Sequence, residues 1–469
     1  MPASLMDCFP ALTPWLQVSR IPLAASVAAL DQIRKSVELG FDLSSQAMET
    51  GFSLAGRFND GFTSCRREDA AGWIRLVDDL TQTWADFVRT RTLDSLDTFH
   101  RRRSGEIDFI DFFIEPVPSQ ALANQPASTQ LLLDLPSLRL WDLSTAESHA
   151  VGNYTVVFAP RAGHHSNIAE RTALFLRDHG LSRMALVEQK CADEIPLFID
   201  GRRHREDFSG QVAQYRQVLA HLKAKTGNPS HLVAVCQPGP LLMATLILHP
   251  DLGRTFGSAG APMHTEGQSG FLTDFARAMG PSYIDLLLWF FGRTVTSENI
   301  GRGRRVYDGR LQVLGFYMLG LDQHLRNWKR LLADLRDGNT AAAERQRAFY
   351  QWYNYVHHFP AGFIRDTFRK IFVGNELIRG KLTVGGRTIG IENYPAGTPI
   401  WALGGSKDDI APEGQAVGHL PLIHGVADAD KLSLTCDGGH MALFRSEKVL
   451  NQYYSRIADF LLARSDGAV

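Results

Sequence analysis

The feature that most constrains the fold is an alternation, from about residue 131 onward, of short unbroken apolar runs with amphipathic segments of helical length. Examples of the amphipathic segments are residues 167–180 and 208–227. Apolar strands that alternate with helices are typical of a parallel sheet covered by helices on both faces, so we expect an α/β fold. The predicted strands span residues 155–160, 183–189, 231–236, 254–262, 398–405 and 431–439.

The alternation is interrupted by a long aromatic region with helical spacing. An insertion between two strands most simply forms a cap over their carboxyl ends, where open α/β sheets bind ligands. Residues 21–100 also show helical periodicity, and residues 116–130, rich in Pro, Ser, Ala and Gln, indicate a linker or surface loop. We predict an N-terminal helical region over 1–115, an α/β core formed by 131–264 and 396–469, and a helical cap insertion over 265–395.

Charge and hydropathy narrow the classes of partner. The formal net charge is -1, which argues against nucleic acid as the main partner, and we expect the basic runs at 99–105 and 301–310 to be solvated loops. The longest apolar run, 283–292, is too short for a transmembrane helix. The first residues show no secretion signal, so we expect a cytoplasmic protein. The sequence leaves open whether the protein forms a homo-oligomer.

The five cysteines contain no C-x-x-C pair, which excludes the usual patterns of a disulfide framework or a structural zinc site. Cys436 and His440 lie four residues apart, but no second pair of ligands accompanies them. We therefore expect neither a metal ion nor a cofactor.

The stretch LVAVCQPGPLLM, residues 232–243, ends a predicted strand on Cys236 and turns at once into a predicted helix. A strand, a nucleophile and a helix in that order form the nucleophile elbow of the α/β-hydrolase fold. Ala234 is small enough for the turn, and Pro238 suits the first turn of a helix. A helix N-terminus favours the thiolate form of a cysteine. Both glycines of the G-x-S-x-G pattern are missing, so a small buried apolar side chain is the alternative for Cys236.

Candidate partners of the thiol follow two later strands. Asp408 and Asp409 come after strand 398–405, and His440 comes after strand 431–439. The chain order of nucleophile, acid and histidine is that of an α/β-hydrolase. We predict a Cys236–Asp408–His440 triad, with Asp408 preferred because it lies nearer the end of its strand. Asp409 is then left for solvent or a helix cap.

A hydrolase of this kind also needs donors for an oxyanion. The backbone N–H of Gln237 directly follows the thiol residue. A second donor is expected in the turn after strand 155–160, from the N–H of Ala162 or of Arg161.

With these residues in place, the sequence resembles the polyhydroxyalkanoate enzymes that have a catalytic cysteine, namely the intracellular polyhydroxybutyrate depolymerases and the related synthases. The resemblance covers roughly 150–460. It implies an α/β-hydrolase core with a cap and attack of the Cys236 thiolate on a 3-hydroxyacyl ester. His440 would be the base, and Asp408 would hold the imidazole tautomer. The matching segments are VAVCQPGP, GAP (260–262), FPAGFIRDTFRKIFVGNELIRG (359–380), VGGRTI (384–389), GSKDDIAPEGQ (405–415) and GGHMALF (438–444).

Two positions favour hydrolysis of the polymer over its synthesis. Synthases usually have glycine where this chain has Pro238, and they tend to have histidine where it has Asp409. The resemblance therefore implies a hydrolase of intracellular polyhydroxyalkanoate or of 3-hydroxyacyl oligomers. A synthase-like acyltransferase that uses 3-hydroxyacyl-CoA is the first alternative. An inactive granule-associated protein is the second, because residues 188–196 lack the Asn-Ala-Arg-Asp run common in the depolymerases.

Overall fold

The computed structural model describes residues 105–106, 108–113, 115, 117, 129–145, 151–162 and 167–467. The chain forms two compact units. The helical unit comprises 1–119 and 310–355, and the sheet unit comprises 120–309 and 356–469. The predicted N-terminal helices over 21–100 lie outside the described residues.

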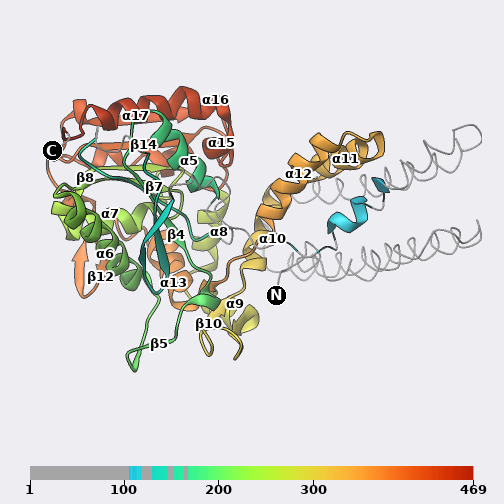
Figure 1. Ribbon diagram of the computed structural model, residues 1–469. Helices are drawn as coiled ribbons and strands as arrows, with labels where there is room; N and C mark the ends of the chain where they lie inside the picture. The colour runs from blue at the N-terminus through green and yellow to red at the C-terminus, as the bar shows by residue number, and fades with distance from the viewer. Residues whose placement is uncertain are drawn as a thin grey trace, which may run out of the picture. The chain divides into compact units, whose positions relative to one another are not determined.

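An eight-stranded sheet with the order β1-β2-β4-β3-β7-β8-β14-β15 organises the sheet unit (Figure 1). β2 pairs antiparallel with β1 and with β4, and every other neighbouring pair is parallel. Each of the predicted strands is present, and the predicted α/β-hydrolase fold is confirmed. The strands are β1 (Gln130–Asp134), β2 (Leu138–Asp142), β3 (Thr155–Phe158), β4 (Met184–Gln189), β7 (Ser230–Val235), β8 (Gly253–Ala259), β14 (Ile400–Gly405) and β15 (Lys431–Cys436).

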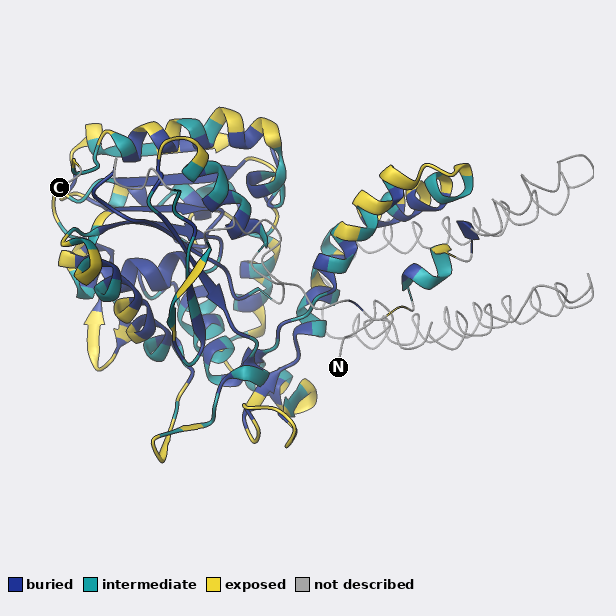
Figure 2. Ribbon diagram, in the orientation of Figure 1, coloured by how far each residue is buried: buried dark blue, intermediate teal, exposed yellow. Residues whose placement is uncertain are grey.

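The central strands are buried along their whole length because helices cover both faces of the sheet. In Figure 1, α5 and α17 lie over one face, and α6 and α7 lie over the other. The buried sheet and the exposed outer sides of the helices are evident in Figure 2. These helices and the later short ones are α5 (Asn167–Asp178), α6 (Phe208–Thr226), α7 (Gly239–Leu248), α14 (Glu413–Val417), α15 (Ala442–Arg445), α16 (Glu447–Val449), the π-helix η9 (Leu450–Tyr454) and α17 (Ser455–Leu462).

The long segment between β8 and β14 is divided between the two units. Residues 265–309 and 356–395 belong to the sheet unit, whereas 310–355 belong to the helical unit. A cap over 265–395 therefore stays a prediction. The elements of the sheet unit in this segment are α8 (Phe271–Met279), α9 (Tyr283–Phe291), β9 (Gly292–Thr294), β10 (Arg305–Tyr307), β11 (Phe359–Pro360), α13 (Ala361–Asp366), the π-helix η5 (Thr367–Val373), β12 (Leu382–Val384) and β13 (Arg387–Ile389).

The helical unit contains α10 (Gly309–Leu319), α11 (Leu321–Asp337) and α12 (Thr340–Tyr353). Its core is aromatic: the rings of Tyr317 and Trp328 lie 5.8 Å apart, and that of Tyr350 lies 5.9 Å from Trp328. The Tyr350 hydroxyl lies 2.9 Å from Nδ1 of His324. None of the helices in the part of the chain that the structure describes is both long and apolar enough to cross a bilayer.

Close contact between β8 and β14 gives a test of the sheet. Gly257 lies beneath the fully buried ring of Trp401, and a Cβ atom at Gly257 would lie 1.8 Å from Cε2 of that ring. We expect Gly257→Ala to lower the free energy of unfolding by about 1–3 kcal/mol, the usual cost of overpacking. Urea unfolding followed by circular dichroism would measure it.

Gly315→Ala in α10 is the control, because a Cβ atom there meets nothing within 4 Å. In a helix this change is expected to be neutral or to stabilise by up to about 1 kcal/mol. Equal unfolding curves for Gly257→Ala and the wild type would contradict the packing argument.

Candidate active site

Cys236 lies in a sharp turn between β7 and α7. Its backbone is left-handed, with a φ of 62°, which is uncommon for a residue other than glycine. The N–H of Cys236 donates to the carbonyl of Ala259 on β8 at 2.8 Å, and the carbonyl of Cys236 accepts from the N–H of Gly239 at 3.3 Å. Strained backbone of this kind persists where the surroundings determine it, and it is frequent at active sites. The turn has the geometry of a nucleophile elbow.

Asp408 and His440 come together in the turns that follow β14 and β15. Nδ1 of His440 lies 2.8 Å from Oδ2 of Asp408, and both side chains are buried. The other carboxylate oxygen of Asp408, Oδ1, accepts from the N–H groups of Ile410 and Ala411, both at 2.9 Å. The carboxylate of Asp408, rather than that of Asp409, is thus the one that orients the imidazole.

The side chain of Cys236 lies close enough to the His440 ring to affect its pKa. Burial disfavours the charged imidazole, but the negative charges of Cys236 and Asp408, together with the hydrogen bond to Asp408, raise the pKa of His440 well above 6.5. For Asp409, burial and the neighbouring charge of Asp408 raise the pKa of the carboxyl group. The sequence-predicted Cys236, Asp408 and His440 therefore form one connected group.

A glycine makes room for the imidazole. Gly260, just after β8, has a φ of 55°, and a Cβ atom there would lie 3.1 Å from Cε1 of His440. Both the backbone conformation and the close approach favour glycine at this position.

The candidate oxyanion donors, the N–H groups of Gln237 and of Arg161 or Ala162, lie in the turns that follow β7 and β3. These two strands are direct neighbours in the sheet. The N–H of Arg161 donates to Oε1 of Gln237 at 3.2 Å, so it is already engaged. Of the two N–H groups considered in the turn after β3, that of Ala162 is thus the better candidate. The side chain of Gln237 also ties this turn to the elbow, a role that the sequence analysis did not assign to it.

Like the side chain of Gln237, the guanidinium of Arg161 has a role that the sequence analysis did not assign to it. It is buried, and its Nε and Nη2 atoms donate to Oε1 of Gln189 at 3.2 and 2.9 Å. Nη2 also donates to Oε1 of Gln211 at 3.3 Å, and the guanidinium lies 5.3 Å from the ring centre of Phe363. Burial lowers the pKa of Arg161, and the negative charge of Glu206 opposes this. These contacts anchor the turn that carries Ala162.

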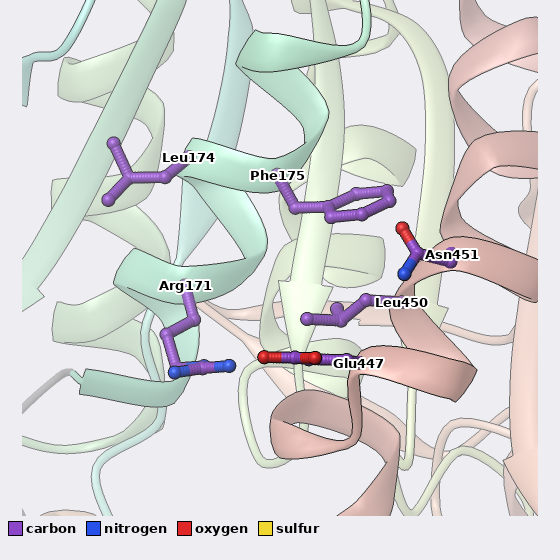
Figure 3. A pocket seen from close by; sticks show the side chains of 6 residues that line it. All are labelled: Arg171, Leu174, Phe175, Glu447, Leu450 and Asn451. Carbon is purple, nitrogen blue, oxygen red and sulfur yellow. The ribbon is translucent and has the colours of Figure 1, made fainter.

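A cavity of about 370 Å³ lies elsewhere on the sheet unit, between α5 and the segment α16–η9. In Figure 3 the side chains of Arg171 and Glu447 point toward each other across it. Neither Cys236 nor His440 lines it. Its lining contains no nucleophile, and we assign it no part in the chemistry. The lining residues are Arg171, Leu174, Phe175, Glu447, Leu450 and Asn451.

Comparison with known families relates the C-terminal part of the chain to enzymes that degrade polyhydroxybutyrate. Residues 260–465 match the family described as "PHB de-polymerase C-terminus". The match relates this range to the polyhydroxybutyrate depolymerases, as the sequence resemblance predicted, and it supports an ester hydrolase. The matched range includes Asp408 and His440 but not Cys236. No curated protein matches the chain.

Similar solved structures include two lipases and an esterase. A monoglyceride lipase from Saccharomyces cerevisiae is 13% identical over 75% of this chain and 99% of its own, with a TM-score of 0.44. A monoacylglycerol lipase from Paleococcus ferrophilus is 12% identical over 70% of this chain and 100% of its own, with a TM-score of 0.38. A thermophilic esterase from Thermogutta terrifontis is 10% identical over 72% of this chain and 100% of its own, with a TM-score of 0.36.

The raised pKa of His440 gives a test that needs no substrate. Histidine NMR, with the His440 signal identified through His440→Gln, should show a proton retained well above pH 6.5 in the wild type. In the double variant Cys236→Ala, Asp408→Asn, burial is the main influence left, so the pKa should fall below 6.5. An unchanged titration would contradict the charge network.

The same shift predicts how stability changes with pH. A raised histidine pKa means that the folded state holds the proton more tightly than the unfolded state. The stabilisation of the folded state by His440 is therefore complete below pH 6.5, the ordinary pKa of histidine. It is lost as the pH rises through the higher pKa that His440 has in the folded protein. Urea unfolding of the wild type and the double variant should show a stability difference that shrinks above pH 6.5.

Proposed function

We propose that this protein is a thiol-dependent hydrolase of polyhydroxyalkanoate or of 3-hydroxyacyl oligomers, with Cys236, Asp408 and His440 as its catalytic triad. The observation that carries the proposal is the hydrogen bond between the Asp408 carboxylate and the His440 imidazole, together with the neighbouring Cys236 on a left-handed turn before a helix. The family match over 260–465 supports the class of substrate.

Acylation would begin with the thiolate of Cys236, because the thiolate is the nucleophilic form of cysteine. Its sulfur forms a bond to the ester carbonyl carbon, and the carbonyl oxygen becomes an oxyanion near the N–H groups of Gln237 and Ala162. When this intermediate collapses, the ester C–O bond breaks. The departing alkoxide takes the proton from His440, which leaves a thioester on Cys236 and a neutral imidazole.

Deacylation reverses the role of His440. The neutral imidazole takes a proton from water, and the resulting hydroxide adds to the thioester carbon. The C–S bond then breaks, which releases the hydroxyacid and restores the thiolate beside the imidazolium. Asp408 keeps the proton on Nδ1 of His440, so that the other ring nitrogen exchanges protons with the reacting groups. The net reaction consumes one ester and one water and gives one acid and one alcohol.

The choice between the two aspartates tests the triad. We expect Cys236→Ala to abolish hydrolysis of soluble 3-hydroxybutyrate oligomers. Asp408→Asn should lower kcat by up to about 10⁴-fold, because the imidazole loses its orienting carboxylate. Asp409→Asn is the matched control and should change kcat little. Full activity of Cys236→Ala, or equal losses for the two aspartate variants, would contradict the assignment.

The acceptor of the acyl group needs a separate experiment. Wild type and Cys236→Ala are incubated with amorphous polyhydroxybutyrate granules and, separately, with 3-hydroxybutyryl-CoA. Soluble hydroxybutyrate products from the wild type alone would support the hydrolase. Release of free CoA with growth of polymer would instead favour an acyltransferase. Co-sedimentation with granules and no turnover of either substrate would favour a granule-binding protein.

The side chain of Gln237 gives a further test, because it holds the turn that carries Ala162. Gln237→Met keeps the length of the side chain but removes its oxygen acceptor. We expect kcat to fall by about 10-fold or more, with little change in KM. Removal of an oxyanion donor typically lowers kcat by about 10²–10³-fold, and this variant should not exceed that loss because the donor is displaced and not removed.

Alkylation of Cys236 by iodoacetamide is the control for this variant, because that reaction forms no oxyanion. Its rate, followed by mass spectrometry of the Cys236 peptide, should be the same in Gln237→Met and in the wild type. A parallel fall in alkylation and turnover would mean that the elbow itself is disturbed, and would contradict a role in positioning the donor.

A further inference from the structure

One end of the sheet unit exposes large apolar side chains. On α9 (Tyr283–Phe291), Ile284 and Leu288 are buried and hold the helix to the unit. The opposite side presents aromatic rings to solvent: Trp289 is 70% exposed, and Phe290 is 61% exposed. The two rings lie 4.5 Å apart in an edge-on arrangement. A cluster of exposed aromatic side chains, unlike scattered single ones, marks a binding surface.

Two loops extend this surface beside α9. The loop between β9 and β10 carries Ile300, which is 70% exposed, and the hairpin of β5 (Phe198–Ile199) and β6 (Arg202–Arg203) carries Phe198, which is 58% exposed. The loop is bonded to both ends of the hairpin, because Nη2 of Arg304 donates to the carbonyls of Pro196 at 2.5 Å and His204 at 3.4 Å. Figure 2 shows α9 and both loops projecting from the same end of the sheet unit.

The charges around these apolar groups are mostly positive. Residues 196–205 and 286–305 contain five exposed arginines but only two exposed carboxylates, Asp200 and Glu298, whereas the whole chain has a net charge of -1. Arg305 is held beside the rings, because its Nη2 donates to the carbonyl of Leu288 at 2.7 Å. The exposed arginines are Arg202, Arg203, Arg205, Arg302 and Arg305.

We propose that this surface, formed by α9, the β9–β10 loop and the β5–β6 hairpin, binds an anionic phospholipid surface. Aromatic and aliphatic side chains that project from a helix and from loop tips can enter the boundary between headgroups and acyl chains. The arginines beside them would lie at the level of the anionic headgroups. A second copy of this chain would bring the same positive charge, and an uncharged polymer surface would make no use of the arginines.

Vesicle flotation with the full-length protein tests the proposal. We expect binding to vesicles of phosphatidylcholine mixed with phosphatidylglycerol and little binding to phosphatidylcholine alone, with the binding weakened by added salt. Trp289→Ser with Phe290→Ser, and separately Arg202→Glu with Arg203→Glu, should each reduce binding by about tenfold or more. Arg387→Glu with Arg456→Glu reverses two exposed charges on other elements and should leave binding unchanged.

Thermal unfolding would establish that each variant is folded. Equal binding to neutral vesicles, or full binding by both surface variants, would overturn the proposal. Binding to bare polyhydroxybutyrate particles that is insensitive to the arginine changes would overturn it in favour of a polymer surface. The assay requires no turnover and can be run with Cys236→Ala, so its failure and the failure of the proposed hydrolase activity can be distinguished.

Discussion

The left-handed backbone of Cys236 is the constraint on which the rest of the site depends. Such a conformation costs about 1–3 kcal/mol for a residue with a side chain, so neighbouring structure must impose it. Here the residue follows a wholly buried strand with a parallel partner on each side, and its N–H is held by Ala259. The thiol of Cys236 is thereby placed beyond the end of β7, near His440 in the turn after β15.

Those turns meet the thiol because parallel strands end at the same edge of a sheet. The N–H of Ser406 donates to the carbonyl of Cys436, and the N–H of Lys407 donates to the carbonyl of Gly438, so the two turns are bonded to each other. Asp408 and His440 lie one and two residues beyond these bonds, which accounts for their contact although they are 32 positions apart in the chain. The arrangement of the proposed triad is a property of the sheet edge rather than of any single loop.

Sequence reasoning located six strands of the parallel part of the sheet. Four of them, β3, β4, β7 and β14, are buried along their whole length, which favours unbroken apolar runs, whereas the edge strand β15 is only partly buried. It did not identify β1 and β2, which are antiparallel and only partly buried, so that neither is a continuous buried run. It proposed Cys236, Asp408 and His440 from their chain order, but it did not foresee the buried guanidinium of Arg161, because a charged side chain in a turn ordinarily faces solvent. The buried guanidinium of Arg161 is stabilised by Gln189 and Gln211 and by the negative charge of Glu206, whose approach depends on tertiary packing. The division of residues 265–395 between two units likewise leaves no local signal in the sequence.

Pro238 and Pro240 have a consequence for how the site assembles. The start of a helix normally offers several free N–H groups to an anion, but proline has none, so the start of α7 offers fewer. The proposed second donor lies in the turn after β3, about 75 residues earlier in the chain, and Gln237 bridges the two segments. A folding intermediate that formed only the elbow would thus contain a thiol without a complete oxyanion site. Reactivity toward esters would then appear only after the central strands had paired, which would spare a partly folded chain from unproductive acylation.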